Sequence, residues 1–182
     1  MDRRELIKMV SLATGSVLSA PLLSSILVSC KDDIPKNEED YILQFFNKED
    51  FSLVKKLIDV ILPKTDSPSA TEVGVHQMID LMIGTVYKPK DSVNYSKHFT
   101  ALKNYLDSSS ESHIKTLGKL SNSNNEKNKS ARKAFMDLKQ QTVAYYLSTE
   151  NIATNYLNYL PIPGKYEACI SLDEVGGKAW AL

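Results

Sequence analysis

Apolar residues recur three and four positions apart through the middle of the chain, which places them on one face of a helix. The first such run predicts a helix over residues 47–62, which Asn47 caps and Pro63 ends. A second run predicts a helix over residues 71–86, and Pro89 interrupts the pattern after it.

Further runs continue the pattern toward the C-terminus. They predict a helix around residues 99–106, a short one at 114–120, a long one at 131–148 and a last short one ending near residue 156. Residues 121–130 are polar and rich in asparagine, which predicts an exposed loop. No alternating run is long enough for the core of a sheet, so we expect a mostly α fold.

The helical period is lost after Pro161, where the pairs Pro163-Gly164 and Gly176-Gly177 occur. We therefore expect a small helical domain over residues 47–160, followed by an extended, irregular tail over residues 161–182.

The N-terminus has the pattern of an export signal. Arg3 and Arg4 precede a long apolar stretch that runs up to Cys30. We predict that residues 1–29 are a signal peptide, that Cys30 is lipidated and that residues 30–46 form a polar tether. The acyl chains would anchor the exported protein to a membrane, facing the periplasm or the cell surface.

Three interpretations of this segment stay open. The arginine pair resembles a twin-arginine (Tat) signal, which exports folded proteins, although Leu6 stands where phenylalanine is common; the same pair suits a Sec signal. A permanent transmembrane helix is disfavoured by Gly15 and Pro21. Cys30-Lys31-Asp32-Asp33 resembles the tag of surface lipoproteins in some Bacteroidota, so we expect a Gram-negative source of that kind.

Charge and cysteine content narrow the possible functions. Without residues 1–29 the chain keeps 19 basic and 20 acidic residues and no basic stripe, which argues against nucleic-acid binding. The remaining residues suffice for one domain with its own core. Lipidation of Cys30 would leave Cys169 single, so that thiol is either buried and inert or bonded to another chain.

The chain offers little for catalysis or for a cofactor of its own. Its three histidines lack the spacing of metal ligands and are expected at the surface or the core edge. Neither a haem-attachment motif nor a phosphate-binding glycine loop occurs in the sequence. Asp66 is expected to accept hydrogen bonds in its loop, and Asp59 and Asp80 to flank turns at helix ends, rather than to transfer protons.

Aromatic residues gather in the last 38 residues, which hold six of the fifteen in the chain. Tyrosine and tryptophan often anchor protein interfaces. The alternative, that these rings pack on the chain's own helices, stays open. The predicted partner interface comprises Tyr145, Tyr146, Tyr159, Pro163, Gly164, Tyr166, Cys169 and Trp180.

Several segments together resemble one protein family. They are LIDVILPKTDSPSA at 57–70, with EVGV and Ile79-Asp80 shortly after it, YYLSTE at 145–150, YLPIPGKY at 159–166 and GGKAW at 176–180. In their order and spacing they resemble the gluconate 2-dehydrogenase subunit 3 family. Ser69 and Ala168 depart from it, since glycine is expected at both positions, and these changes affect loop shape more than identity.

The resemblance implies an accessory role. Such chains are similar to the small subunit of membrane-bound sugar and polyol dehydrogenases, in which FAD and the substrate sit in a separate large subunit of the glucose-methanol-choline (GMC) type, often with a cytochrome c as electron acceptor. The small subunit is thought to help the large one mature and leave the cell. A free-standing surface lipoprotein that binds a glycan or a protein is the alternative, and an independent hydrolase is a third.

Overall fold

The computed structural model describes residues 41–123, 125–162, 164–165 and 168–181, and the chain from Ile42 onward forms one compact unit. In these ranges the regular secondary structure is helical, with one isolated β-bridge and no strand, so the predicted mostly α fold is confirmed. The predicted signal segment, with Arg3, Arg4 and Cys30, lies outside the described residues.

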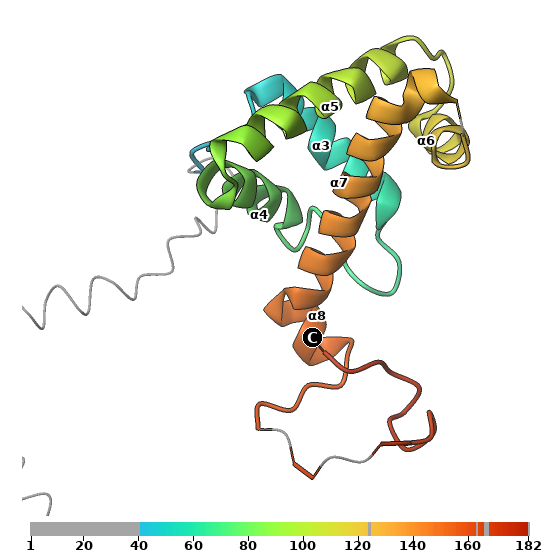
Figure 1. Ribbon diagram of the computed structural model, residues 1–182. Coiled ribbons are helices and arrows are strands. Elements are labelled where there is room, and N and C mark those ends of the chain that lie inside the picture. The colour runs from blue at the N-terminus through green and yellow to red at the C-terminus, as the bar shows by residue number, and fades with distance from the viewer. Residues whose placement is uncertain (1–40, 124, 163, 166–167, 182) are drawn as a thin grey trace, which may run out of the picture. The chain divides into compact units, whose positions relative to one another are not determined.

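The elements, labelled as in Figure 1, are α3 (Lys48–Ile61), α4 (Val75–Leu81), the π-helical turn η2 (Met82–Val86), α5 (Pro89–Asp107), α6 (His113–Ser121), the 3-10 turn η3 (Glu126–Asn128), α7 (Lys129–Ser148) and α8 (Glu150–Asn155).

Helix α3 forms as its sequence predicts. The Asn47 side chain accepts a hydrogen bond from the Asp50 backbone N–H at 2.8 Å, which caps the first turn. The helix ends before Pro63, and Val54, Leu57 and Ile58 on its inner face are fully buried.

The predicted helix over residues 71–86 starts later than expected and changes its winding. The Asp59 carboxylate accepts hydrogen bonds from the backbone and side chain of Thr71, which holds residues 71–74 in a turn. Gly74 then takes a left-handed conformation, with φ at 77°, and α4 begins at the next residue. The last five residues of the run are wound as the π-helical turn η2.

Helix α5 begins at Pro89, a residue that the apolar pattern marks only as an interruption. Proline suits the first position of a helix because that position needs no N–H donor and has the φ angle that proline favours. The other predicted helices lie within a few residues of α6, α7 and α8, and the polar stretch at 121–130 contains η3. None of the described helices has the length and apolar composition needed to cross a bilayer.

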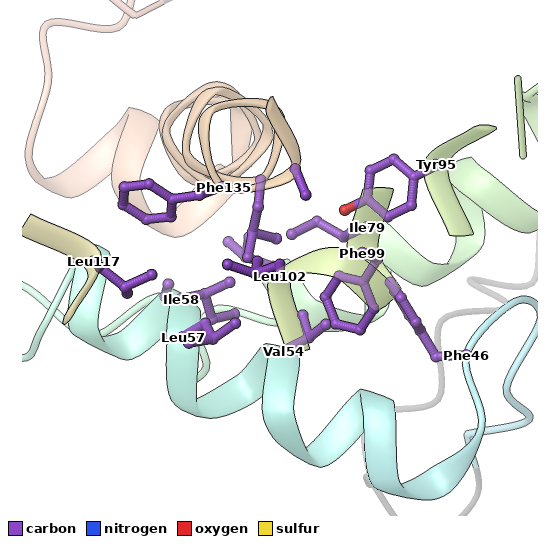
Figure 2. Close-up of a cluster of buried hydrophobic side chains, with 14 of the residues drawn as sticks. Phe46, Val54, Leu57, Ile58, Ile79, Tyr95, Phe99, Leu102, Leu117 and Phe135 are labelled. Carbon is purple, nitrogen blue, oxygen red and sulfur yellow. The ribbon is translucent and has the colours of Figure 1, made fainter. Parts of the chain in front are cut away.

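The core lies between α3, α5 and α7, with α4 and α6 closing its ends. Figure 2 shows Val54, Leu57 and Ile58 of α3 facing side chains of α5 and α7. Phe46, which precedes α3, packs on Phe99 of α5 with ring centroids 5.2 Å apart. The segment just before α3 is therefore part of the core, and Ile42 is the first residue of the compact unit.

A buried carboxylate holds that segment in place. Asp80, at the end of α4, is fully buried and accepts hydrogen bonds from three consecutive backbone N–H groups, those of Gln44 at 2.7 Å, Phe45 at 3.0 Å and Phe46 at 2.7 Å. Hydrogen bonds to an ionised acceptor are the stronger kind, and a buried carboxylate requires them. Asp80 thus fixes the point at which the chain enters the domain.

Gly84 in η2 allows the same segment to approach closely. A Cβ atom at residue 84 would lie 2.6 Å from Cβ of Gln44 and 2.9 Å from its carbonyl carbon and oxygen. Real side chains do not come so near a backbone, so only glycine fits here. Residues 44–46 are consequently held by hydrogen bonds to Asp80 on one side and by contact with η2 on the other.

Substitution of Gly84 by alanine should destabilise the domain. The new methyl group must displace the backbone of Gln44 and weaken its bond to Asp80, and such overpacking costs about 1–3 kcal/mol. Urea unfolding followed by far-UV circular dichroism measures this change in the free energy of unfolding.

Gly118→Ala is the matched control. Gly118 lies inside α6, and nothing comes within 4 Å of the position of an added Cβ. Because alanine is the better helix former, this variant should gain up to about 1 kcal/mol. A Gly84→Ala protein as stable as the wild type would contradict the close approach described above.

Candidate partner-binding site

The chain after α8 folds back on its own beginning. We call the described residues of the range 156–181 the C-terminal loop; in Figure 1 this loop starts at the end of α8, and its far end returns toward that start. The backbone N–H of Asn158 donates to Ala179 O at 2.8 Å, and the N–H of Ala181 donates to Asn158 O at 2.9 Å. Asn158 and Trp180 thereby form an isolated parallel bridge that closes the loop.

The side chain of Asn158 adds two more bonds to this closure. Its amide Nδ2 donates to Val175 O at 2.9 Å and to Lys178 O at 2.8 Å. Between these two carbonyls, Gly176 and Gly177 have φ angles of 61° and 71°, a conformation that other residues rarely adopt. The irregular tail predicted from the sequence therefore has defined turns, and one asparagine ties its two ends together.

The C-terminal loop exposes much apolar surface. It holds seven of the twelve large hydrophobic side chains that are exposed among the described residues, including Ile162 (85% exposed), Leu172 (73%) and Trp180 (47%). By contrast, Ile152 in α8 is the last residue along the described chain that is buried in the core. An exposed apolar concentration of this kind marks a site of protein interaction more often than a random feature of the surface.

Four residues of the predicted interface lie exposed in this loop, namely Tyr159, Gly164, Cys169 and Trp180. Pro163 and Tyr166, which were also predicted to contact a partner, lie outside the described residues.

Cys169 carries a free and exposed thiol. The buried, inert thiol considered from the sequence is therefore wrong for Cys169, and a bond to another chain is the alternative that stays a prediction.

The two adjacent tyrosines of α7 have different surroundings. Tyr146 is 8% exposed, and its hydroxyl donates to Pro68 O at 2.8 Å and lies 3.0 Å from the Ser67 hydroxyl. Tyr145 is half-buried, and this burial together with the neighbouring Tyr87 raises the pKa of its hydroxyl. Tyr146 thus connects α7 to the loop before α4, which leaves it little surface for a partner.

The remaining candidates for chemistry have structural surroundings. His76 is buried in the core, not at its edge as expected, and His98 Nδ1 lies 2.6 Å from the Ser130 hydroxyl. Asp59 and Asp80 bind backbone groups near helix ends, as predicted, whereas Asp66 makes no hydrogen bond to any described residue. In the described ranges no group of three or more His, Cys, Asp or Glu side chains is arranged to hold a metal ion.

One shallow polar pocket of about 320 Å³ lies between α5 and α7. Gln141 bridges two of its tyrosines, donating to the Tyr87 hydroxyl at 2.8 Å and accepting from the Tyr95 hydroxyl at 3.3 Å. Lys133 pairs with Asp137 at its rim. Burial raises the pKa of Tyr95 above the usual tyrosine range, so this hydroxyl stays neutral and acts as a hydrogen-bond donor. These polar groups mainly satisfy one another and join the two helices.

Sequence reasoning missed Asn158, the residue that organises the candidate site. An asparagine just after a helix is an ordinary turn residue, and that local signal explains nothing about partners 17 and 20 positions downstream. The pair Gly176-Gly177 accompanies the loss of helical period in the sequence, but the contact of this segment with Asn158 could not be inferred from it.

Comparison with known proteins found one family. The family model described as Gluconate 2-dehydrogenase subunit 3 matches residues 48–164, from the first residue of α3 into the C-terminal loop. This match covers more than half of the chain and confirms the resemblance drawn from the sequence. Neither a curated protein nor a solved structure showed significant similarity.

Substitution of Tyr146 by phenylalanine should destabilise the domain without changing its shape. The variant leaves the Pro68 carbonyl without its donor, which costs about 1–2 kcal/mol. Tyr145→Phe is the control, because the Tyr145 hydroxyl bonds to no described residue, and it should change stability by less than about 0.5 kcal/mol. Equal effects of the two variants on the urea midpoint would show that the Tyr146 bond contributes nothing.

Proposed function

We propose, since the chain belongs to the gluconate 2-dehydrogenase subunit 3 family, that it is the non-catalytic small subunit of a flavin-dependent sugar, gluconate or glucoside dehydrogenase. Membership makes it an accessory subunit of a dehydrogenase complex. The family match over residues 48–164 is the observation that carries the proposal. In this proposal FAD and the sugar are bound by a GMC-type large subunit, from which a cytochrome c or another acceptor takes the electrons.

The C-terminal loop supports a role as a structural clamp. Its exposed aromatic and aliphatic side chains, among them Tyr159, Ile162 and Trp180, have no covering element within the described part of this chain. A large subunit that covered them would remove apolar surface from water, which is the main driving force of association. We therefore assign the contact with the large subunit chiefly to this loop.

The N-terminal sequence supports a role in export and maturation. Arg3 and Arg4 resemble a signal for folded export, and a flavoprotein must acquire its cofactor in the cytoplasm, where it folds. A large subunit bound to this chain before export would leave the cell through the address of the small subunit. Lipidation at Cys30 would then hold the complex on the membrane, on the periplasmic side or at the cell surface.

Replacement of Arg3 and Arg4 by lysines tests the joint export. The variant keeps the positive charge that a Sec signal needs and removes the arginine pair that a Tat signal needs. In cells that co-express a GMC-type large subunit, dehydrogenase activity should move from the membrane and periplasmic fractions to the cytoplasm.

Lys8→Arg, which leaves the pair intact, should not change this distribution. If the large subunit is exported equally well with the paired lysines, or in the absence of this chain, the co-transport proposal fails and the free-standing lipoprotein gains support.

Cys169 gives a second test of the complex. An exposed single cysteine in an oxidising compartment is free to bond to a cysteine of the partner. On a non-reducing gel, the exported complex should show one species that contains both subunits and that separates on reduction. Cys169→Ser should abolish that species while the subunits still co-purify, and its absence from the wild-type complex would exclude the bond.

A further inference from the structure

Beyond Leu157, which packs against the core, the C-terminal loop has little support from the helical core. Apart from the half-buried Val175 and Ala181, the described residues from Tyr159 onward are exposed. The shape depends on Asn158, whose N–H, carbonyl and side-chain amide all bond to residues 175–181. Helix α8 itself bonds to the returning part of the loop through a long contact of 3.5 Å from Lys178 Nζ to Asn155 O. One residue therefore decides whether the loop is closed.

We infer that Asn158 is a positioning residue of the subunit interface, which holds the C-terminal loop closed before the partner arrives, so that its apolar side chains are presented together to the large subunit. The inference rests on the proposed function, because it takes the large dehydrogenase subunit as the partner. It adds that the binding element is preformed in the free small subunit and is not an arm that orders on contact.

The geometry connects the closure directly to two predicted anchors. Trp180 is the bridge partner of Asn158, and Tyr159 is its neighbour in the chain. Both rings are about half exposed and are held near the point of closure. Opening the loop would separate these two residues, whereas the closed loop keeps their backbones near one another, and tyrosine and tryptophan are enriched at the centres of interfaces.

Preformation has a clear physical consequence for affinity. A loop of this length loses much conformational freedom when it is ordered, and a partner that must order it binds more weakly. Because of the four hydrogen bonds at Asn158, the loop is ordered when the small subunit folds, before it meets the large subunit.

The charge of the loop favours a protein surface as its occupant. Residues 156–181 contain two lysines and three acidic residues, so they lack the basic excess that attracts anionic lipid headgroups. Apolar side chains around a nearly neutral loop fit an apolar, weakly charged concavity on another protein. Family membership implies a partner dehydrogenase complex, and the large subunit of the proposed function is the occupant that we assign to the loop.

Trp180 is the only tryptophan of the chain and provides a built-in probe. In the purified mature small subunit, acrylamide quenching of its fluorescence reports how accessible the ring is. Asn158→Ala should about double the quenching constant, since the ring is 47% exposed in the closed loop and would be fully exposed in an open one. Asn158→Asp has the same size but cannot donate to the two carbonyls, and it should have the same effect.

Affinity for the separately purified large subunit is measured with the same proteins. Both Asn158 variants should raise the Kd about tenfold or more, mainly through lost preorganisation. The control is Asn155→Ala, whose side chain bonds only to Asn151 within α8 and which should change neither quenching nor Kd. Far-UV circular dichroism should be unchanged in all variants, because the helical core does not include the loop.

The outcomes separate this inference from the proposed function. If the wild type binds the large subunit and the Asn158 variants open the loop yet bind equally well, the positioning role is overturned while the proposed function stands. Unchanged quenching in both variants overturns the role of the Asn158 side chain in the closure, because neither substitution removes the two backbone bonds of residue 158. If the wild-type subunit does not bind the large subunit, the interface role and the proposed function both fail. Acrylamide quenching of Trp180 would still show whether the loop is closed.

Discussion

The arrangement of the domain depends on the buried carboxylate of Asp80. A carboxylate removed from water must be hydrogen-bonded, and this one accepts from three consecutive amides of residues 44–46. The bonds require α4 to lie beside the entering chain, and they direct Phe46 into the aromatic cluster with Tyr95 and Phe99 of α5. Gly84 is required for the same reason, because the entering backbone lies directly against η2. The start of the domain is thus fixed by one polar interaction that the surrounding core encloses.

The sequence predicted the parts of this fold that depend on local periodicity. Helix α3, with its Asn47 cap, followed from spacing alone, because each signal lies within one or two turns. The bonds of Asp80 and Asn158 could not be predicted, because their partners lie from 17 to 36 residues away and no local signal distinguishes these two residues from ordinary turn or capping residues. Pro89 was misjudged because proline both ends helices and begins them, and the choice depends on the tertiary packing of the residues after it.

The exposure of two predicted interface residues followed from the sequence, but the closed loop that carries them did not. The concentration of aromatic residues near the C-terminus identified Tyr159 and Trp180, both exposed in the structure. The same composition also selected Tyr146, whose hydroxyl instead donates to Pro68 O in the loop before α4. Composition could not separate the two cases, because tyrosine is common both in cores and at interfaces. Whether a tyrosine packs in the core or stays available to a partner depends on its burial, and the burial of Tyr146 depends on how α7 packs in the folded domain.

The cysteine content sets the order of events that the proposed export requires. No cysteine lies between residues 31 and 168, so the helices fold without a disulfide and a reducing cytoplasm is no obstacle to them. The apolar C-terminal loop, closed by hydrogen bonds alone, would be able to hold the large subunit at that stage without any covalent bond. Cys169 lies in the same loop and is exposed, so oxidation after export would lock a contact that had already formed. On this proposal the non-covalent contact determines which partner binds, and the disulfide at Cys169 makes the complex permanent only in an oxidising compartment.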